Sequence, residues 1–156
     1  VFNSCPNTRC TVQQPKNWHF LSASLNSPES NTNACFVSKE PVTEEENFTT
    51  GLTVRLYKNI PSALEQPVLR YCSNFLKTME MSSRKEIISM RDFTMEKSPL
   101  YDNCFAVFEC EYKERQFGES DPKLWVHWRL LANETTGSLF ELCFESSVEH
   151  YKENWP

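Results

Sequence analysis

The stretch YDNCFAVFECEY, residues 101–112, alternates like a β-strand and carries two cysteines. Side chains repeat every second residue along a strand, so Cys104, Ala106, Phe108 and Cys110 are expected on one face. A buried face with two thiols points either to a disulfide or to plain packing. The rest of the chain helps to decide between a disulfide and plain packing.

Cysteine is frequent in this chain, with seven in 156 residues. No CxxC spacing occurs, and the three histidines, His19, His127 and His150, stand far apart. The pattern therefore predicts no metal site and no cofactor, and it favours disulfides in an oxidising compartment. Because seven is odd, at least one cysteine lacks an internal partner. It can be free, can pair between chains, or can have lost a partner to processing.

Two sequons, at Asn47 and Asn133, strengthen the case for secretion and predict N-linked glycans. The chain starts on polar residues, as expected of a mature, processed secreted protein. It has no apolar run long enough to span a bilayer. The net charge of −5 argues against nucleic acid as a partner.

Alternating apolar and polar residues dominate most of the chain and predict one all-β domain spanning residues 1–156. A short N-terminal segment, 1–16, precedes the strands, which occupy 17–131. The stretch at 91–101 is ambiguous because Pro99 cannot donate a hydrogen bond within a sheet. The other expected strands are 17–25, 34–42, 47–58, 67–79, 86–90, 101–112 and 122–131.

The C-terminal part of the sequence has a different pattern, because apolar residues there recur at helical spacing. Ser138 and Glu141 form a capping box, so a C-terminal helix is expected over 135–153. Its apolar side would pack on the outside of the strands. Eight antiparallel strands that close on themselves leave room for one small ligand. The sequence therefore predicts an eight-stranded antiparallel barrel with a C-terminal helix.

Several short motifs follow one another in a recognisable order. The second strand carries ACFVSKEP after WHFLSASL in the first. YDNC leads into a later strand, KLW opens another, and LFELCF precedes the chain end. In this order the chain resembles the salivary lipocalins of blood-feeding ticks. That family includes histamine-binding proteins, a complement inhibitor that also captures leukotriene, and a dendritic-cell modulator that binds cholesterol.

The resemblance implies a disulfide between Cys104 and Cys143. The family cysteine that matches Cys35 usually bonds one near the C-terminus, which is absent here, so Cys35 would pair with Cys5 or Cys10, or with neither. Cys72 and Cys110 have no family counterpart. The fold implied is the lipocalin barrel, in a secreted protein of tick saliva that modulates host immunity.

The ligand is expected to be apolar. Two acidic positions that hold amines in some relatives correspond here to Lys123 and Met95, which disfavours histamine or serotonin. A sterol, a fatty acid or an eicosanoid suits the interior better. The candidate lining residues are Trp18, Phe20, Leu52, Val54, Tyr71, Phe75, Ile88, Met90, Phe93, Met95, Phe108 and Trp125. Arg55, Arg70, Lys123 and Arg129 are candidate partners for a carboxylate head group.

Two other functions compete with lipid binding. The chain could instead bind a host immune-cell or plasma protein through loops at 27–33, 80–85 and 116–121, with the pocket vestigial, or it could scavenge biogenic amines. An enzyme is not expected, because no base–nucleophile spacing occurs around His127 or elsewhere.

Overall fold

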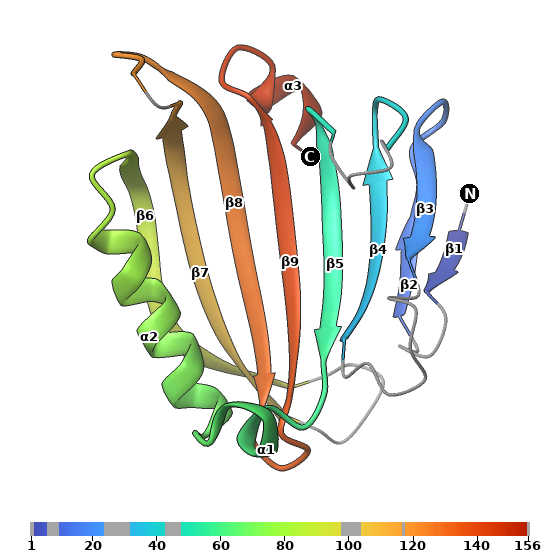
Figure 1. Cartoon of the computed structure of the whole chain (residues 1–156). Coiled ribbons are helices and arrows are strands. Elements are labelled where there is room, and N and C mark those ends of the chain that lie inside the picture. Colours follow the sequence, from blue (N-terminus) through green and yellow to red (C-terminus); the bar gives the residue numbers. More distant parts are fainter. Residues whose placement is uncertain are drawn as a thin grey trace.

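A computed structural model describes residues 2–5, 10–23, 32–42, 48–97, 104–116 and 118–155 of the chain. The described chain is mostly β-structure, with few helices (Figure 1). Its elements are β1 (Phe2–Cys5), β2 (Cys10–Gln13), β3 (His19–Ala23), β4 (Thr32–Ser38), β5 (Gly51–Tyr57), α1 (Ile60–Leu64), α2 (Val68–Glu80), β6 (Lys85–Lys97), β7 (Cys104–Arg115), β8 (Pro122–Asn133), β9 (Ser138–Ser147) and α3 (Tyr151–Asn154).

Seven strands form one antiparallel sheet in the order β3-β4-β5-β9-β8-β7-β6, and β1 pairs with β2 in a separate small sheet. The last strand, β9, lies at the centre of the large sheet, between β5 and β8. Among the described residues, the outer strands β3 and β6 do not pair with each other. The all-β, antiparallel prediction is confirmed, whereas the sheet order is open and not the closed ring of an eight-stranded barrel.

Helix α2 corrects the strand predicted over 67–79. Its buried residues Val68, Cys72 and Leu76 are spaced by four, which is the helical period, and they face the sheet. The segment has no β-branched residue between its first residue, Val68, and Thr78, so little opposes the helix. The Glu134 carboxylate accepts a hydrogen bond from the Leu69 N–H, 3.2 Å away, and so satisfies a donor of the first turn.

Strand β9 corrects the helix predicted over 135–153: most of that range is strand and turn, and the helix α3 begins only at Tyr151. A central strand is covered on both faces, so apolar residues occur on both and imitate helical spacing. Leu139 and Cys143 are buried on the face toward α2, and Phe144 is buried on the other. The β8–β9 turn contains Gly137 at φ 63°, a left-handed conformation that favours glycine.

The strand predicted at 101–112 is confirmed as β7 from Cys104 onward, although Val107, on the opposite face from Ala106 and Phe108, is buried as well. Ala106, Phe108 and Cys110 are all buried in one core cluster with α2. The two short segments at 86–90 and 91–101 belong to one long strand, β6, which has two register shifts. Residues 98–103, including Pro99, lie outside the described part of the chain.

The disulfide expected between Cys104 and Cys143 is wrong, because Cys143 carries a free, buried thiol. The register explains this. Cys110 pairs with Trp128, and Trp128 pairs with Cys143, so Cys143 shares a row with Cys110 and not with Cys104. Cys104 lies six residues along β7 from that row, about 20 Å at roughly 3.3 Å per residue, whereas bonded cysteines have Cα atoms within about 7 Å.

The structure describes some of the other cysteines and sequons and not the rest. Cys72 and Cys110 are free and buried, and Cys35, buried in β4, is not among the free thiols. The side chains of Cys5 and Cys10, and Asn47, lie outside the description. Asn133 is buried, and its side-chain oxygen accepts a hydrogen bond from the Thr136 N–H at 3.0 Å. The folded chain therefore leaves little room for a glycan at Asn133.

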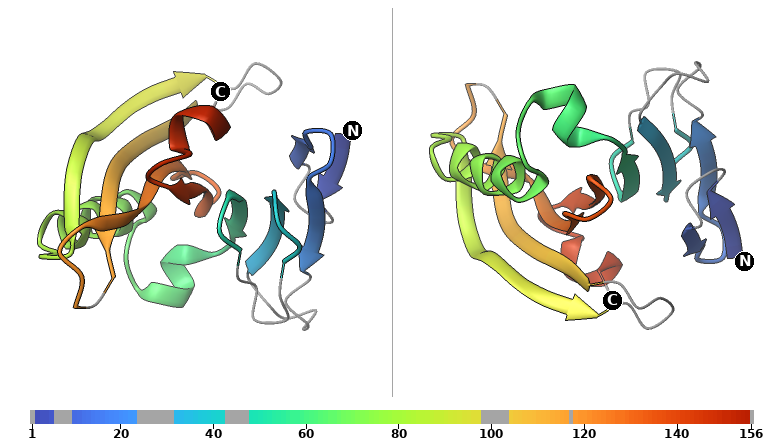
Figure 2. Two further views of the ribbon diagram at one scale, coloured as in Figure 1. Left: turned by 90° about the horizontal axis from the view of Figure 1, so that it is seen from above. Right: turned by 90° about the horizontal axis from the view of Figure 1, so that it is seen from below.

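The sheet carries a different apolar cluster on each face. Helix α2 covers one face, where it packs on β6, β7 and β8. The short α3 packs against β9 from the opposite face, and Figure 2 shows the helices on the two sides of the sheet. Val12 of β2 joins Cys35, Val37 and Val54 in the cluster on the α3 face. That cluster borders an apolar cavity.

Candidate functional site

An apolar cleft of about 440 Å³ lies on the α3 face of the sheet. Sheet strands, the segment after β2 and the end of α3 all contribute to its walls. The lining residues are Val12, Gln13, Pro15, Trp18, Val37, Leu52, Glu109, His127, Arg129, Leu142, Phe144, Asn154 and Trp155. The volume falls in the range of about 300–1,000 Å³ that is typical of small-molecule sites.

The floor of the cleft follows directly from the strand register. One row across the sheet contains Val37, Leu52, Phe144 and His127, each paired with the next on neighbouring strands. Residues in such a row project from the same face, so this row changes from aliphatic through aromatic to polar.

The adjacent row, two residues further along each strand, repeats this change. Val54 pairs with Leu142, Leu142 with Arg129, and Arg129 with Glu109. The cleft therefore has an apolar end over β4, β5 and β9, and a polar end over β8 and β7.

The C-terminal segment forms an aromatic wall of the cleft. The Trp155 ring stacks on the His127 ring at 4.7 Å and contacts the Phe144 ring at 4.8 Å. Tyr151 stacks on Trp125, with centroids 4.4 Å apart and planes within 4°. Ring pairs at these separations stabilise the docked segment beyond the area that they bury. Stacking thus holds α3 and Trp155 against the sheet.

The charged groups at the polar end are paired with one another. Arg129 lies 2.7 Å from a Glu96 carboxylate oxygen and 3.3 Å from one of Glu109. Arg91 forms a second ion pair with Glu109. Burial lowers the pKa of the His127 imidazole below its ordinary value; the Glu111 carboxylate opposes this shift, and Arg129 and Arg91 add to it. The histidine is therefore neutral at neutral pH.

The twelve predicted lining residues are split between the two faces of the sheet. Trp18 and Leu52 line the cleft, while Phe20 and Val54 belong to the apolar cluster beside it. Trp125 lies in the aromatic stack with α3. The remaining seven lie elsewhere: Tyr71, Phe75, Met90 and Phe108 belong to the core under α2, and Ile88, Phe93 and Met95 are exposed on β6.

Of the four predicted cationic partners, only Arg129 lines the cleft. Arg55 pairs with Glu141, Lys123 lies 3.9 Å from Glu119 at the surface, and Arg70 is exposed. The sequence analysis missed the β9 contribution and the Trp155 wall, because it predicted a helix at the chain end. The missed cleft residues include Val37, Leu142, Phe144 and Trp155.

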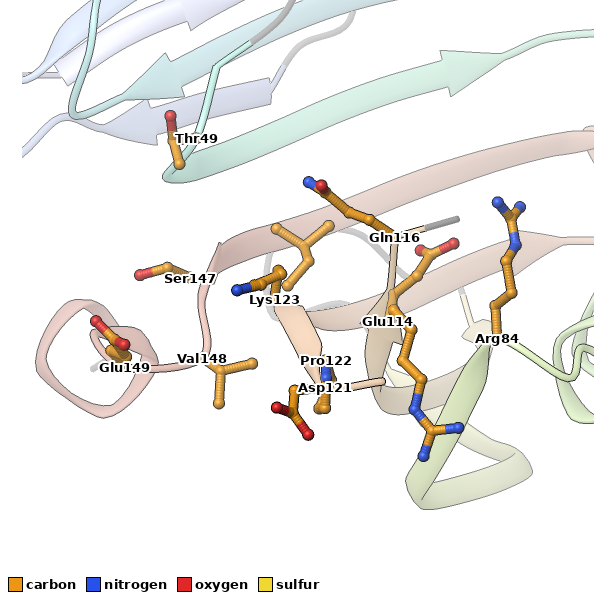
Figure 3. A pocket seen from close by; sticks show the side chains of 12 residues that line it. Thr49, Arg84, Glu114, Gln116, Asp121, Pro122, Lys123, Ser147, Val148 and Glu149 are labelled. Carbon is orange, nitrogen blue, oxygen red and sulfur yellow. The ribbon is translucent and has the colours of Figure 1, made fainter. Parts of the chain in front are cut away.

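A larger depression of about 820 Å³, with a more polar lining than the cleft, lies at the rim of the sheet, where β7 ends and β8 begins (Figure 3). Charged residues of both signs, including Arg84, Glu114, Asp121, Lys123 and Glu149, spread around it and do not converge on one point. It includes part of the predicted loop 116–121. Such a depression offers no apolar enclosure for a ligand, so the smaller cleft is the better candidate site.

Comparison with known proteins leaves the family open: no family model matches this chain, and no curated protein matches its sequence significantly. The part of the chain that the structure describes contains no group of three or more histidine, cysteine or acidic side chains placed to hold a metal ion. None of the helices described here is both long and apolar enough to span a bilayer.

Proposed function

We propose that this chain binds one small hydrophobic ligand in the apolar cleft on the α3 face. The observation that carries the proposal is the grouping of Trp18, Leu52, Leu142 and Phe144 around a cavity of about 440 Å³, whose charged lining residues, Glu109 and Arg129, lie at one end. An apolar molecule that displaces water from these side chains gains roughly 25 cal/mol per Å² of buried apolar surface.

The wider role follows from the resemblance to the salivary lipocalins. A secreted protein that sequesters a lipid mediator would lower its free concentration and so modulate host immune or inflammatory responses. In this proposal the ligand lies in a cleft between the sheet and α3, and the open strand order requires no closed barrel.

The test uses N-phenyl-1-naphthylamine, an uncharged fluorophore whose emission rises in apolar surroundings. The unchanged protein is expected to bind it, and Leu142→Glu, which places a carboxylate in the cleft floor, is expected to weaken binding by about tenfold or more. Met95→Glu is the matched control, because Met95 is 61% exposed on β6 and does not line the cleft.

Trp155→Ala provides a second variant that carries less risk to the fold, because Trp155 is itself partly exposed. Removing this wall is also expected to weaken binding of the fluorophore. Circular dichroism establishes that each variant is folded before the titrations are compared. Unchanged affinity in folded Leu142→Glu and Trp155→Ala proteins would refute the assignment of the cleft.

A further inference from the structure

The row of side chains that forms the cleft floor continues beyond the cleft at both ends. From β3 to β7 the paired residues of this row are Phe20, Val37, Leu52, Phe144, His127 and Glu111. Only the middle four line the cleft. The floor therefore begins on β4 and ends on β8, and the residues at its two ends decide how long a ligand it accepts.

Packed apolar side chains close the end of the floor on β4. Val12 of β2 is only 8% exposed and forms one cluster with Val37 and Val54. Trp18 and Phe20 pack against that cluster from the segment before β3 and from β3 itself, the outermost strand of the sheet. A ligand chain that continued past β4 would have to displace these side chains from one another.

Carboxylates limit the floor at the other end. Glu111, directly opposite His127, accepts a hydrogen bond from Trp125 Nε1 at 2.8 Å. In the adjacent row Glu109 is paired with Arg129. Methylene groups laid over these residues would take water from charged groups and would cover little apolar surface in return. Additional chain length therefore gains nothing beyond β8.

The length of the floor follows from the spacing of the strands. Four neighbouring strands have three gaps between them, or about 14 Å in total at about 4.8 Å each. An extended chain advances roughly 1.2 Å per bond, since a backbone residue of three bonds covers at most about 3.6 Å. The floor thus matches a chain of about twelve carbons.

The volume of the cleft gives a similar limit. A water molecule occupies about 30 Å³ of the liquid, and with this share for each non-hydrogen atom the cavity of about 440 Å³ holds about fifteen such atoms. A twelve-carbon chain with a small head group has about that many. A sterol has nearly twice as many, in a rigid ring system that cannot fold to fit.

From these two limits we infer that the cleft selects its ligand by size, taking a single chain of about twelve carbons or a compact molecule of similar volume, and excluding sterols and longer-chain lipids. The inference rests on the proposed function, since it names the ligand class of the same cleft.

The test measures affinity against chain length by isothermal titration calorimetry. The ligands are the even-numbered alkanoates from octanoate to hexadecanoate, each below its aggregation limit at pH 8. All share one head group, so differences between them report the chain. Affinity is expected to rise about fourfold per added methylene as far as dodecanoate and then to level off. Cholesterol sulfate is expected to bind at least about tenfold more weakly than dodecanoate, because its ring system exceeds the cavity.

Two variants reduce the space in the cleft. Leu142→Phe and Leu52→Phe each place a bulkier side chain in the lining, at positions that are only partly buried. Each is expected to move the break by about two carbons, to decanoate. Met95→Phe is the matched control and should leave the break at dodecanoate, because Met95 is 61% exposed and does not line the cleft. Circular dichroism establishes that each variant is folded.

The outcomes separate the two proposals. If neither N-phenyl-1-naphthylamine nor any alkanoate binds, the proposed function fails and the inference fails with it. If the fluorophore binds but the alkanoates do not, or if affinity keeps rising fourfold per methylene to hexadecanoate, only the inference is overturned. It is overturned equally if cholesterol sulfate binds as tightly as dodecanoate, or if the folded Leu142→Phe and Leu52→Phe proteins keep the break at dodecanoate.

Discussion

The ion pair between Arg55 and Glu141 provides a sensitive test of the strand order. Arg55 Nη1 donates to Glu141 Oε1 at 2.8 Å, and the Tyr57 hydroxyl donates to Glu141 Oε2 at 2.7 Å. Although burial alone would lower the pKa of the Arg55 guanidinium, the Glu141 carboxylate more than offsets this, and the pKa lies above its ordinary value. The contact exists because β9 pairs with β5, where Arg55 is directly opposite Glu141.

The two partners are buried to different extents, and this difference predicts unequal costs of removal. The Glu141 side chain is 6% exposed, and that of Arg55 is 33% exposed. Arg55→Met leaves a buried carboxylate with only the Tyr57 hydroxyl, and breaking a buried pair in this way is expected to cost about 3 kcal/mol. Glu141→Gln leaves an arginine that water can reach and keeps an acceptor for Tyr57, so about 1–2 kcal/mol is expected.

Urea denaturation followed by circular dichroism measures both costs as changes in the free energy of unfolding. The double variant completes a thermodynamic cycle and should show a coupling energy of about 1 kcal/mol or more, as residues in direct contact do. If Arg55→Met cost no more than Glu141→Gln, or if the cycle showed no coupling, the reasoning from unequal burial would be refuted. The adjacency of β5 and β9 would then need another explanation.

Two further predictions follow from the perturbed pKa values. Because the pKa of His127 is lowered in the folded protein, the unfolded chain binds the proton first, and stability should fall as the pH decreases from about 6.5 toward the folded pKa. His127→Gln should remove that part of the pH dependence, as pH-dependent thermal melts will show. Burial also raises the pKa of the Cys72 thiol to about 12 and that of Cys110 to about 11, and it raises the pKa of Cys143 well above its usual value. Iodoacetamide at pH 8 should therefore leave these three thiols unmodified in the native protein and label them in denaturant, and native labelling of any of them would contradict their burial.

The sequence predicts most of the strands because one face of each strand is covered more than the other. β7 shows this in part: Ala106, Phe108 and Cys110 are buried on one face, whereas on the other face Phe105, Glu109 and Glu111 are partly exposed and only Val107 is buried. This contrast between faces appears in the sequence as a period of two, whereas β4 is buried on both faces over residues 34–38.

The two errors of secondary structure have opposite causes. In α2 the predicted strand ignored the spacing of Val68, Cys72 and Leu76, which only a helix brings to one side. In β9 no local signal distinguishes the structures well, because both faces of a central strand are covered. The pairing of β9 with β5 and β8 depends on how α1 and α2 connect β5 to the later strands. The local sequence pattern does not predict this connection.

The central position of β9 also explains how one strand serves both the fold and the cleft. Its odd-numbered residues, such as Glu141 and Cys143, pack on the α2 face, and its even-numbered residues Leu142 and Phe144 line the cleft. Because alternate residues point to opposite faces, a change at 142 alters the cleft without touching the Arg55–Glu141 pair. A change at 141 should alter stability and leave the cleft lining intact. The predicted separation of binding effects from stability effects along a single strand is therefore a direct consequence of β9 lying between β5 and β8.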